Sequence, residues 1–434
     1  MTHLRSWGGV VLPLGLGLAL ATWVRPARAG NDDEVIVGNE AAMTGGAITA
    51  TSRTGSSLYY NPAGLVNVEA SSVDASASAY GVRLYRADGL LQFGDGRRGD
   101  GQVTEIVLIP SAVSYVRPLS DSVRGGIGVF VNRWSDFDIR ARILEGSPEA
   151  LLTVASRYQK ADAIGGVGIR VTDDLRLGFT LHAIYTTVEQ STQIGGGSDV
   201  SSFSVSSLAE STGVGLRLGA GLQWDVVAGL VLGVGLATPS ARIFSRYVED
   251  ALVSVDTPST RLFDAGGVEE QRFGWEWEHP FRARLGLAYQ FDEDGWISLD
   301  GDILTPLANA DLQVDRRIDF NLRLGGIVGI TPSWALGAGI FTDRSGETSP
   351  LASDFYGGTL GVRYRNERAL DPQKEEEDRL VFETTVALRY AYGSGSASTL
   401  IIDVDDAGEI YLSDGVTSFT AHEIGLHVGG ALRF

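Results

Sequence analysis

The sequence predicts an all-β protein: a transmembrane, fourteen-stranded antiparallel β-barrel with an N-terminal hatch that plugs the lumen. Three observations lead to this prediction. Apolar and polar residues alternate with period two over segments of about 12–18 residues, longer than the ~5–6 residues of an ordinary soluble strand. The connections between these segments alternate between short and long. The chain also begins with an export signal and ends in Phe434 on an apolar strand face.

Residues 1–29 have the pattern of a secretory signal peptide. An apolar run from Val10 to Val24 is followed by Ala27-Arg28-Ala29, a small-residue cleavage site. The run is shorter than the ~20 residues that a membrane-spanning helix needs, so an uncleaved anchor helix is the weaker alternative. We therefore expect cleavage near Ala29.

Residues 30–69 do not alternate and are mostly small and polar. Tyr59, Tyr60 and Leu65 would be costly to leave in water, and a fourteen-stranded barrel has a lumen to fill. The segment is therefore expected to be a hatch, with a flexible leader as the alternative. The barrel itself is expected over residues 70–434.

The last predicted strand shows the alternation most clearly, with Ile424, Leu426 and Val428 on one face and Glu423 and His427 on the other. Such strands suit a wall with lipid outside and a polar lumen inside. The fourteen strands are expected at roughly 70–86, 103–118, 122–135, 155–171, 175–194, 206–224, 230–246, 276–291, 296–308, 315–330, 334–345, 354–366, 379–395 and 419–434.

The turns between these strands fall into two classes. Ser120-Asp121 and Thr331-Pro332-Ser333 are examples of the tight turns, which outer-membrane barrels place on the periplasmic side. The intervening connections are mostly long and polar, and the charged segment 367–378 is one exception on the short side. Aromatic residues gather near strand ends, as interfacial girdles do: Trp134, Tyr158, Tyr185, Trp224, Trp275, Trp277, Trp296, Trp334, Tyr390 and Tyr392.

Composition excludes several classes of function. The 434 residues carry a formal net charge of −19, which argues against binding nucleic acid. The absence of cysteine excludes disulfides, thiolate catalysis and cysteine zinc sites. The mean hydropathy of +0.05 is what the average of a lipid-facing and a polar strand face would give. No pattern indicates a cofactor.

Asn61-Pro62-Ala63-Gly64-Leu65 stands just before the first predicted strand. With the signal peptide, the hatch-like segment, fourteen strands and Phe434, it makes the chain resemble the FadL/TodX-type transporters of the Gram-negative outer membrane. That family takes up long-chain fatty acids and aromatic hydrocarbons. The resemblance implies passive uptake of a hydrophobic compound. The ligand would be caught by outer loops, held in the lumen against the hatch and released sideways through a kink in the third strand.

The resemblance also assigns residues. Asn61, Pro62 and Ala63 would belong to the hatch, where Pro62 fixes its own φ and restricts Asn61. Gly125 and Gly126 lie in the third predicted strand and are the candidates for its kink. Glycine occurs throughout the predicted strands, so this pair alone is a weak signal.

The predicted lumen face is strongly charged, which departs from a purely apolar channel. Arg282, Arg284, Arg323 and Arg389 are candidate contacts for a carboxylate headgroup. The alternative is that these charges form structural ladders that neutralise each other and bind the hatch. The full set is Arg170, Arg217, Arg282, Arg284, Arg317, Arg323, Arg363 and Arg389, opposed by Asp300, Asp302, Asp319, Glu383 and Glu423.

Residues 147–155 have the pattern of a short loop helix that begins after Ser147. Its apolar residues Leu151, Leu152 and Val154 could form a capture site on an outer loop. The alternative is that they only pack this helix against its own loop.

Other constellations are weaker. Residues 403–414 resemble a calcium loop but lack its ligands at two positions, and a hairpin turn is the better interpretation. His422 and His427 are five apart on a strand and so face opposite ways. We therefore expect no metal site, and no group of serine, histidine and acid that indicates catalysis.

Two rival functions remain: an outer-membrane enzyme barrel of the lipase or protease kind, and a structural or adhesive surface barrel. The enzyme would need a convergent catalytic group, and the adhesin would not need a hatch. The expected partners are a hydrophobic small molecule, membrane lipid and, through terminal Phe434, the barrel assembly machinery. A monomer is expected.

Overall fold

The structure is a computed structural model that describes residues 35–198, 201–257, 261–292, 295–309, 314–346, 353–369, 379–404 and 410–434. The expected signal peptide with its cleavage site at Ala29 lies outside these ranges. So do most of the charged segment 367–378 and the centre of the calcium-like stretch 403–414.

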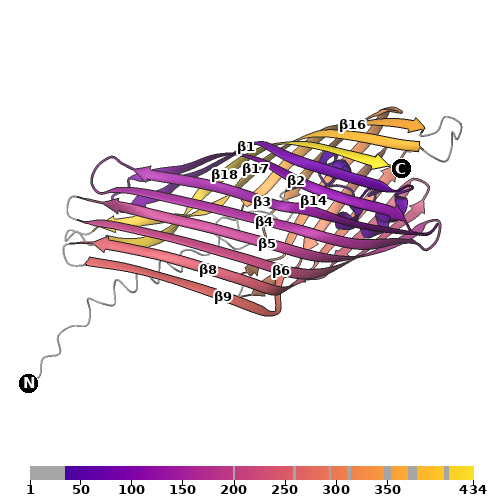
Figure 1. Ribbon diagram of the computed structural model, residues 1–434. Helices are drawn as coiled ribbons and strands as arrows, with labels where there is room; N and C mark the ends of the chain where they lie inside the picture. The colour runs from indigo at the N-terminus through magenta and orange to yellow at the C-terminus, as the bar shows by residue number, and fades with distance from the viewer. Residues whose placement is uncertain are drawn as a thin grey trace, which may run out of the picture.

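The described chain is almost entirely strand, and the strands form one sheet that closes on itself. Sixteen strands follow the order β5-β4-β3-β2-β1-β18-β17-β16-β15-β14-β11-β10-β7-β6-β8-β9. A further pairing joins β5, the first strand of this order, to β6 near its other end and closes the sheet into a barrel (Figure 1). Strands that are neighbours in this order pair antiparallel, so the expected antiparallel barrel architecture is confirmed.

The strands of the sheet are β1 (Ser72–Phe93), β2 (Arg98–Pro118), β3 (Val123–Ile143), β4 (Glu149–Arg170), β5 (Leu175–Gly197), β6 (Ser202–Val227), β7 (Leu230–Ala237), β8 (Ser240–Asp256), β9 (Arg261–His279), β10 (Arg282–Gln290), β11 (Trp296–Leu304), β14 (Asp319–Thr331), β15 (Trp334–Asp343), β16 (Ser353–Ala369), β17 (Arg379–Val404) and β18 (Ile410–Arg433). A separate small hairpin is formed by β12 (Leu307–Asn309) and β13 (Val314–Arg316).

The sheet has sixteen strands where the sequence predicts fourteen, because two expected strands are each interrupted. Pro239 separates β7 from β8, and Pro280 separates β9 from β10. Proline has no N–H to give to a ladder, so it interrupts pairing at these points. β6 accordingly pairs with β7 along its last part and with β8 along its first part.

Most of the connections predicted to be long are largely strand in the structure. β1 and β2, for example, pair as far as Gln92 and Arg98, and β4 and β5 as far as Glu149 and Gly197. These extensions lie at the end of the barrel away from the C-terminus, which we call the far end; the end with the C-terminus is the near end (Figure 1). The far extensions were missed because their outward faces mix polar residues with apolar ones such as Leu151 and Leu252, so no clean alternation marks them as strands.

The predicted helix over 147–155 is wrong: this stretch is the start of β4. Ala150 pairs with Ile143 of β3 on one side and with Gly196 of β5 on the other. Ladder pairing on both edges outweighs the weak local helix signal of Ser147 and Pro148, since propensity yields to tertiary context.

Residues 35–71 lie inside the barrel at its near end (Figure 1). They form α2 (Asn39–Met43), α3 (Ser57–Tyr60) and the 3₁₀ helix η1 (Pro62–Asn67), and nearly all of their side chains are buried. α2 packs against β14 to β18, while η1 packs against β3 to β6 on the opposite wall. The segment therefore spans the lumen from wall to wall.

Glycines on the inner wall let the backbone of this segment approach closely. A Cβ added at Gly178 would lie 2.2 Å from the backbone carbon of Pro62, and one at Gly221 only 2.1 Å from Asn61 Oδ1. At Gly339 an added Cβ would meet the Thr44 backbone at 2.2 Å. The high glycine content thus has a direct packing role where the segment meets the wall.

The outward face of the wall is apolar along the near half of the strands. Leu285, Leu287, Leu322 and Leu324 are among the exposed large side chains there. Of the aromatic residues expected in girdles, Trp224, Trp277 and Trp334 are exposed near strand ends, whereas Tyr185 and Tyr390 are exposed in the middle of long strands and Tyr158 and Trp296 are buried inside. Among the described helices, none is both long and apolar enough to cross a membrane.

Two apolar clusters fill different parts of the interior. The near cluster is built around the N-terminal segment and includes Met43, Leu58, Tyr59, Leu65 and Phe130. The far cluster contains no residue of that segment and is built from the strand extensions. Its buried members are Ala87, Leu90, Leu91, Phe93, Val103, Ile139, Ala141, Ile143, Ala150, Leu152, Ile194, Phe203, Val205, Val253, Ala397, Leu400 and Ile402.

Candidate functional site

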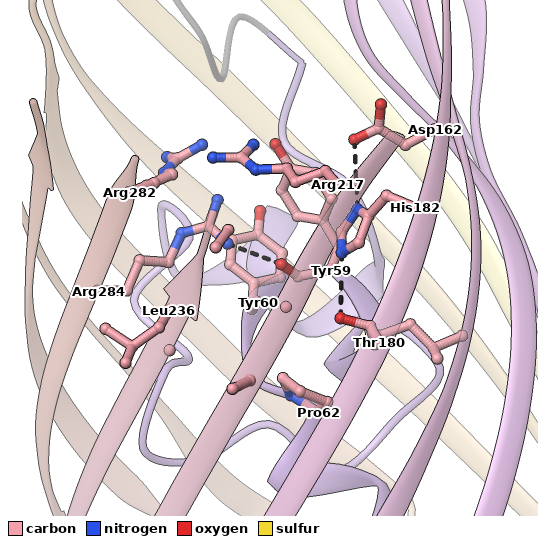
Figure 2. Close-up of a pocket in the computed structure, with 15 residues that line it drawn as sticks. Tyr59, Tyr60, Pro62, Asp162, Thr180, His182, Arg217, Leu236, Arg282 and Arg284 are labelled. Atoms are coloured by element: carbon pink, nitrogen blue, oxygen red, sulfur yellow. Dashed lines mark hydrogen bonds and ion pairs between the residues drawn. The ribbon is translucent and has the colours of Figure 1, made fainter. Parts of the chain in front are cut away.

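The candidate site is a small pocket between the N-terminal segment and the barrel wall (Figure 2). Leu58, Tyr59, Tyr60 and Pro62 line it from the inside. The wall contributes polar side chains from neighbouring strands at one level: Asp162, Thr180, His182, Arg217, Arg282 and Arg284. The pocket thus joins two aromatic rings to a set of buried charges.

Tyr59, Tyr60 and Arg284 form the inner corner of the pocket. Arg284 donates from Nη1 to the Tyr59 carbonyl at 2.7 Å, as Figure 2 shows, and its guanidinium lies 4.8 Å from the Tyr59 ring centre. The two tyrosine rings meet edge to face with centres 5.1 Å apart. Hydrogen bonding and cation–π contact together hold the segment against β10.

Three of the four candidate headgroup arginines converge on one carboxylate. Arg282 forms a buried ion pair with Asp302, Arg323 lies 3.5 Å from the same oxygen and Arg284 3.8 Å from it. Arg389 does not join them, because it pairs with Glu423 on another part of the wall at 2.8 Å. The cluster around Asp302 therefore has more positive than negative side chains.

Arg217 adds a further buried cation at the mouth of the pocket. Its Nε donates to the Thr238 carbonyl at 2.8 Å and its Nη2 to the Pro280 carbonyl at 3.1 Å. These carbonyls stand at the two proline interruptions of the wall. Among the described residues no carboxylate lies within ion-pair distance of Arg217, so its direct partners there are backbone oxygens, and Asp162 acts on its charge from farther away.

His182 is a site residue that the sequence analysis did not single out. Its Nε2 lies 3.1 Å from Thr180 Oγ1, and its Nδ1 lies 3.9 Å from Asp162 Oδ2, too far for a hydrogen bond (Figure 2). Within the described residues, His182 Nδ1 and Asp162 Oδ1 are buried without a hydrogen-bond partner. The period-two pattern places His182 on the lumen face, and that was the signal available for finding it.

The Asn61-Pro62-Ala63 motif is placed where the segment meets β6. Asn61 Nδ2 donates to the Thr49 carbonyl at 2.7 Å and to the Leu222 carbonyl at 2.9 Å. Its Oδ1 accepts from the Ala63 N–H at 3.2 Å and so caps η1, with Pro62 at the first helical position. The motif therefore both closes a turn and ties the segment to the wall.

The barrel wall has an unpaired stretch between β2 and β3. The two strands pair from Pro118 and Arg124 as far as Ala112 and Phe130, and meet again only at Gln102 and Arg140. Pro110, which cannot donate, lies in β2 at the start of this stretch. The backbone ladder between these two strands is thus interrupted at mid-height.

This stretch corrects the position expected for the kink in the third strand. Gly125 and Gly126 pair regularly with Arg117 and Val116 of β2, and with β4 on the other side. The irregularity instead lies at Asn132, where the pairing of β3 with β4 shifts register. Gly126 lies against Leu58 of the segment and Gly125 against Leu119, while proline and a bulge interrupt the pairing.

The start of the described N-terminal segment occupies the inner side of this gap. The Val35 N–H donates to the Asn132 carbonyl at 3.0 Å, and Val35 packs with Val107 and Ile109 of β2. On the outer side Ile106 is 80% exposed and Leu108 70% exposed. The gap is therefore apolar both inside and outside.

A second small pocket lies on the opposite side of the segment. It is lined by Ile36 and Ala42 of the segment and by Arg389 and His427 of the wall, among others. His427 is held by Ser78 at 3.2 Å and by Asn39 at 3.1 Å. Arg389 thus lies at a separate site from the other candidate headgroup arginines.

The three candidate capture residues are split between two faces of β4. Leu152 belongs to the far apolar cluster and Val154 packs against it, whereas Leu151 is exposed on the outside. They are therefore not a loop surface, and two of them line the interior of the far end.

No metal-binding group is found where the structure can be assessed: within the described ranges, no three histidine or carboxylate side chains gather as a metal site requires. The centre of the calcium-like stretch, residues 405–409, lies outside those ranges.

No protein-family model and no curated protein matches this sequence. Solved structures do match. A Pseudomonas aeruginosa FadL homologue superposes with a TM-score of 0.64 at 12% identity, over 93% of this chain and 100% of that one. The Pseudomonas putida toluene transporter TodX gives 0.63 at 14% identity, over 93% and 100%. The Ralstonia pickettii toluene transporter TbuX gives 0.54 at 14% identity, over 92% and 98%.

These similarities extend over the strands and the lumen segment together, since they cover nearly all of both chains. At such low identity they establish the fold. The chain therefore has the fold of the FadL/TodX-type transporters, the family that its sequence resembles.

Proposed function

We propose that this protein is an outer-membrane channel through which hydrophobic compounds pass inward without an energy source. The observation that carries the proposal is a closed barrel with a lumen spanned by its own N-terminal segment and a wall that is unpaired between β2 and β3. A water-filled pore would need neither feature. The route would run from the far cluster, past the pocket, to the gap in the wall.

The far cluster supports the first step of this route. Inward-facing side chains above the segment are apolar, although a lumen filled with water would favour polar ones. A hydrophobic compound can replace these contacts at little cost in free energy. Leu152 and Val154 would be among its first contacts inside the barrel.

The pocket supports the second step. Arg282, Arg284 and Arg323 share one carboxylate, and Arg217 lies beside them. An anionic headgroup placed there would find charge-assisted donors, with Tyr59 and Tyr60 beside its apolar part. Long-chain fatty acids would use both features, and aromatic hydrocarbons would use only the rings.

The gap supports the last step. Val35 fills the inner side of the opening through apolar contact and one hydrogen bond. Moving it aside would connect the lumen with the apolar outer surface at Ile106 and Leu108. A hydrophobic compound would then leave directly into lipid and would not need to cross the near end.

The proposal also covers the N-terminal segment, the number of wall strands, export and the oligomeric state. Residues 30–69 would act as the hatch, and β7 with β8 and β9 with β10 would each be one bent wall strand, which gives a fourteen-stranded wall. The export signal would be cleaved near Ala29, and Phe434 would be read by the assembly machinery. The protein would act as a monomer.

Reconstituted liposomes test the proposal. Uptake of a pyrene-labelled long-chain fatty acid and of toluene is measured with the protein, without it, and with two variants. Ile106→Asn places a polar group beside the gap, whereas Leu181→Asn places one on the wall away from it, at a side chain that is also exposed. Uptake should fall severalfold in the first variant and stay near wild type in the second. If neither compound enters faster with the protein than without it, the transport function is wrong.

A further inference from the structure

The ends of β17 and β18 form an extension that leaves the barrel wall. β16 parts from β17 after Gly395, and β1 parts from β18 after Ala87 pairs with Phe419. Beyond these points β17 and β18 continue to pair with each other as far as Val404 and Ile410. Residues 396–404 and 410–418 thus form a two-stranded arm, which we call the flap.

The flap does not continue the wall but crosses the far mouth of the barrel. Its β17 edge, which β16 has left, pairs in parallel with the end of β1 at Leu91–Phe93 and Leu400–Ile402. In the wall itself β18 lies between β1 and β17. The edge of β17 that faces away from β18 can reach β1 only if the arm bends inward over the lumen.

The two faces of the flap differ as those of a cover would. Leu400 and Ile402 lie on one face of the flap and belong to the far cluster, and Leu400 is only 1% exposed. On the opposite face Tyr411, the register partner of Asp403, is 46% exposed. The same cluster contains Ile194, Phe203 and Val253 from the opposite wall, so the flap closes the apolar interior from above.

The junction between the flap and β1 is short. Three residue pairs make a parallel ladder, and the Gly94 N–H donates to the Ile402 carbonyl at 2.9 Å. Parallel pairing is slightly weaker per residue than antiparallel pairing, and short ladders open at a low free energy. At its base the arm begins with Gly393-Ser394-Gly395, small residues that tolerate bending.

We propose that the flap is a lid over the far apolar cluster, and that it opens by separating from β1 at this parallel junction. The inference rests on the proposed function for what passes beneath the lid. When the junction separates, Leu400 and Ile402 leave the cluster, and a hydrophobic compound can take their place. Closure then buries the compound again above the pocket.

Cysteine labelling tests the opening without any transport assay, because the natural chain has no cysteine. Leu400→Cys places the probe on the buried face of the flap. Ile164→Cys is about as buried but lies in the near cluster. In lipid nanodiscs a water-soluble maleimide should react with the first at least about tenfold faster than with the second, since labelling follows local opening. Equal, slow reaction at both positions would overturn the lid.

A disulfide lock tests the junction. A Cβ added at Gly94 would lie 2.9 Å from Asp403 Cγ, so Gly94→Cys with Asp403→Cys can link the flap to β1. Ser396→Cys with Ser418→Cys joins register partners within the flap and leaves the junction free. Each pair is also combined with Leu400→Cys.

The oxidised Gly94–Asp403 lock should lower both Leu400→Cys labelling and uptake of the pyrene-labelled fatty acid at least about tenfold, and reduction should restore both. The oxidised control within the flap should change neither. If the locked protein labels and takes up the probe at the reduced rate, the lid proposal fails. If labelling responds to the lock but no form transports the probe, the lid stands and the proposed transport function fails.

Discussion

The near and far halves of the lumen both contain an apolar cluster, but buried charges join the wall to the N-terminal segment in the near half. In the near half the N-terminal segment meets a wall of buried charges and glycines, and ion pairs such as Arg363 with Glu40 join the two. In the far half no part of the segment is present, and apolar side chains of the strand extensions pack against one another. One sheet therefore encloses two interiors with different physical properties.

The difference matches the two requirements of the proposed function, which are to hold the N-terminal segment in one position and to admit an apolar compound. Charges and hydrogen bonds have directional partners, so they fix the segment in one position. Apolar contacts are not directional, so a ligand can replace them with little loss. The near half is suited to specificity and the far half to exchange.

The largest expected effect on stability comes from a variant in the near half of the lumen. Asp302→Ala removes the carboxylate that three buried arginines share, and uncompensated buried charge costs about 3–5 kcal/mol. The free energy of unfolding, measured by urea titration in lipid vesicles, should fall by that amount. Asp138→Ala, which removes an exposed partner of Arg140 on the outside, is the control and should change little. A small effect at Asp302 would mean that water screens these charges.

The next effect tests the far half. Leu152→Ala deletes a side chain that is buried in the far cluster, and such deletions cost about 2–5 kcal/mol. Leu151→Ala changes the neighbouring residue on the exposed face and serves as the matched control. Equal effects of the two variants in the same titration would show that the far interior is not packed as described.

The smallest expected effect tests the close contact between the N-terminal segment and the wall. In Gly178→Ala the new methyl group would overlap the Pro62 backbone, and such overpacking costs about 1–3 kcal/mol. In Gly165→Ala the added carbon has no neighbour within 4 Å, so this variant should match wild type. Single-channel conductance in planar bilayers should rise for Gly178→Ala as the segment loosens. Unchanged conductance and stability would argue that the segment adapts without moving.

Much of the wall follows from local pattern. Alternation located every wall strand in its near part, because there the outward face is apolar and the inward face polar. The same rule failed in the far extensions, where exposed apolar side chains such as Leu151 and Leu252 interrupt the alternation, and the segments were expected as loops. Residues 147–155 show the failure most plainly: a local helix signal was overruled by pairing with β3 and β5.

The site divides in the same way. The position of Arg282, Arg284 and Arg323 on the lumen face was predictable, because alternate residues of a strand point to the same side. Their convergence on Asp302, and the separation of Arg389 from them, depend on which strands are neighbours in the closed barrel. The interrupted ladder near Asn132 also escaped prediction, because a missing ladder is a relation between two strands that neither strand reveals alone.

The sequence by itself determined that the chain is an all-β barrel, that a non-alternating segment precedes the wall, and that its lumen face is charged. Those properties depend on period two and composition, which are local. Only the tertiary structure decided where the ladder between β2 and β3 is interrupted, which charges meet, and that the β17–β18 extension pairs with the end of β1. Each of these is set by register between strands distant in the chain, and register is a property of the closed sheet.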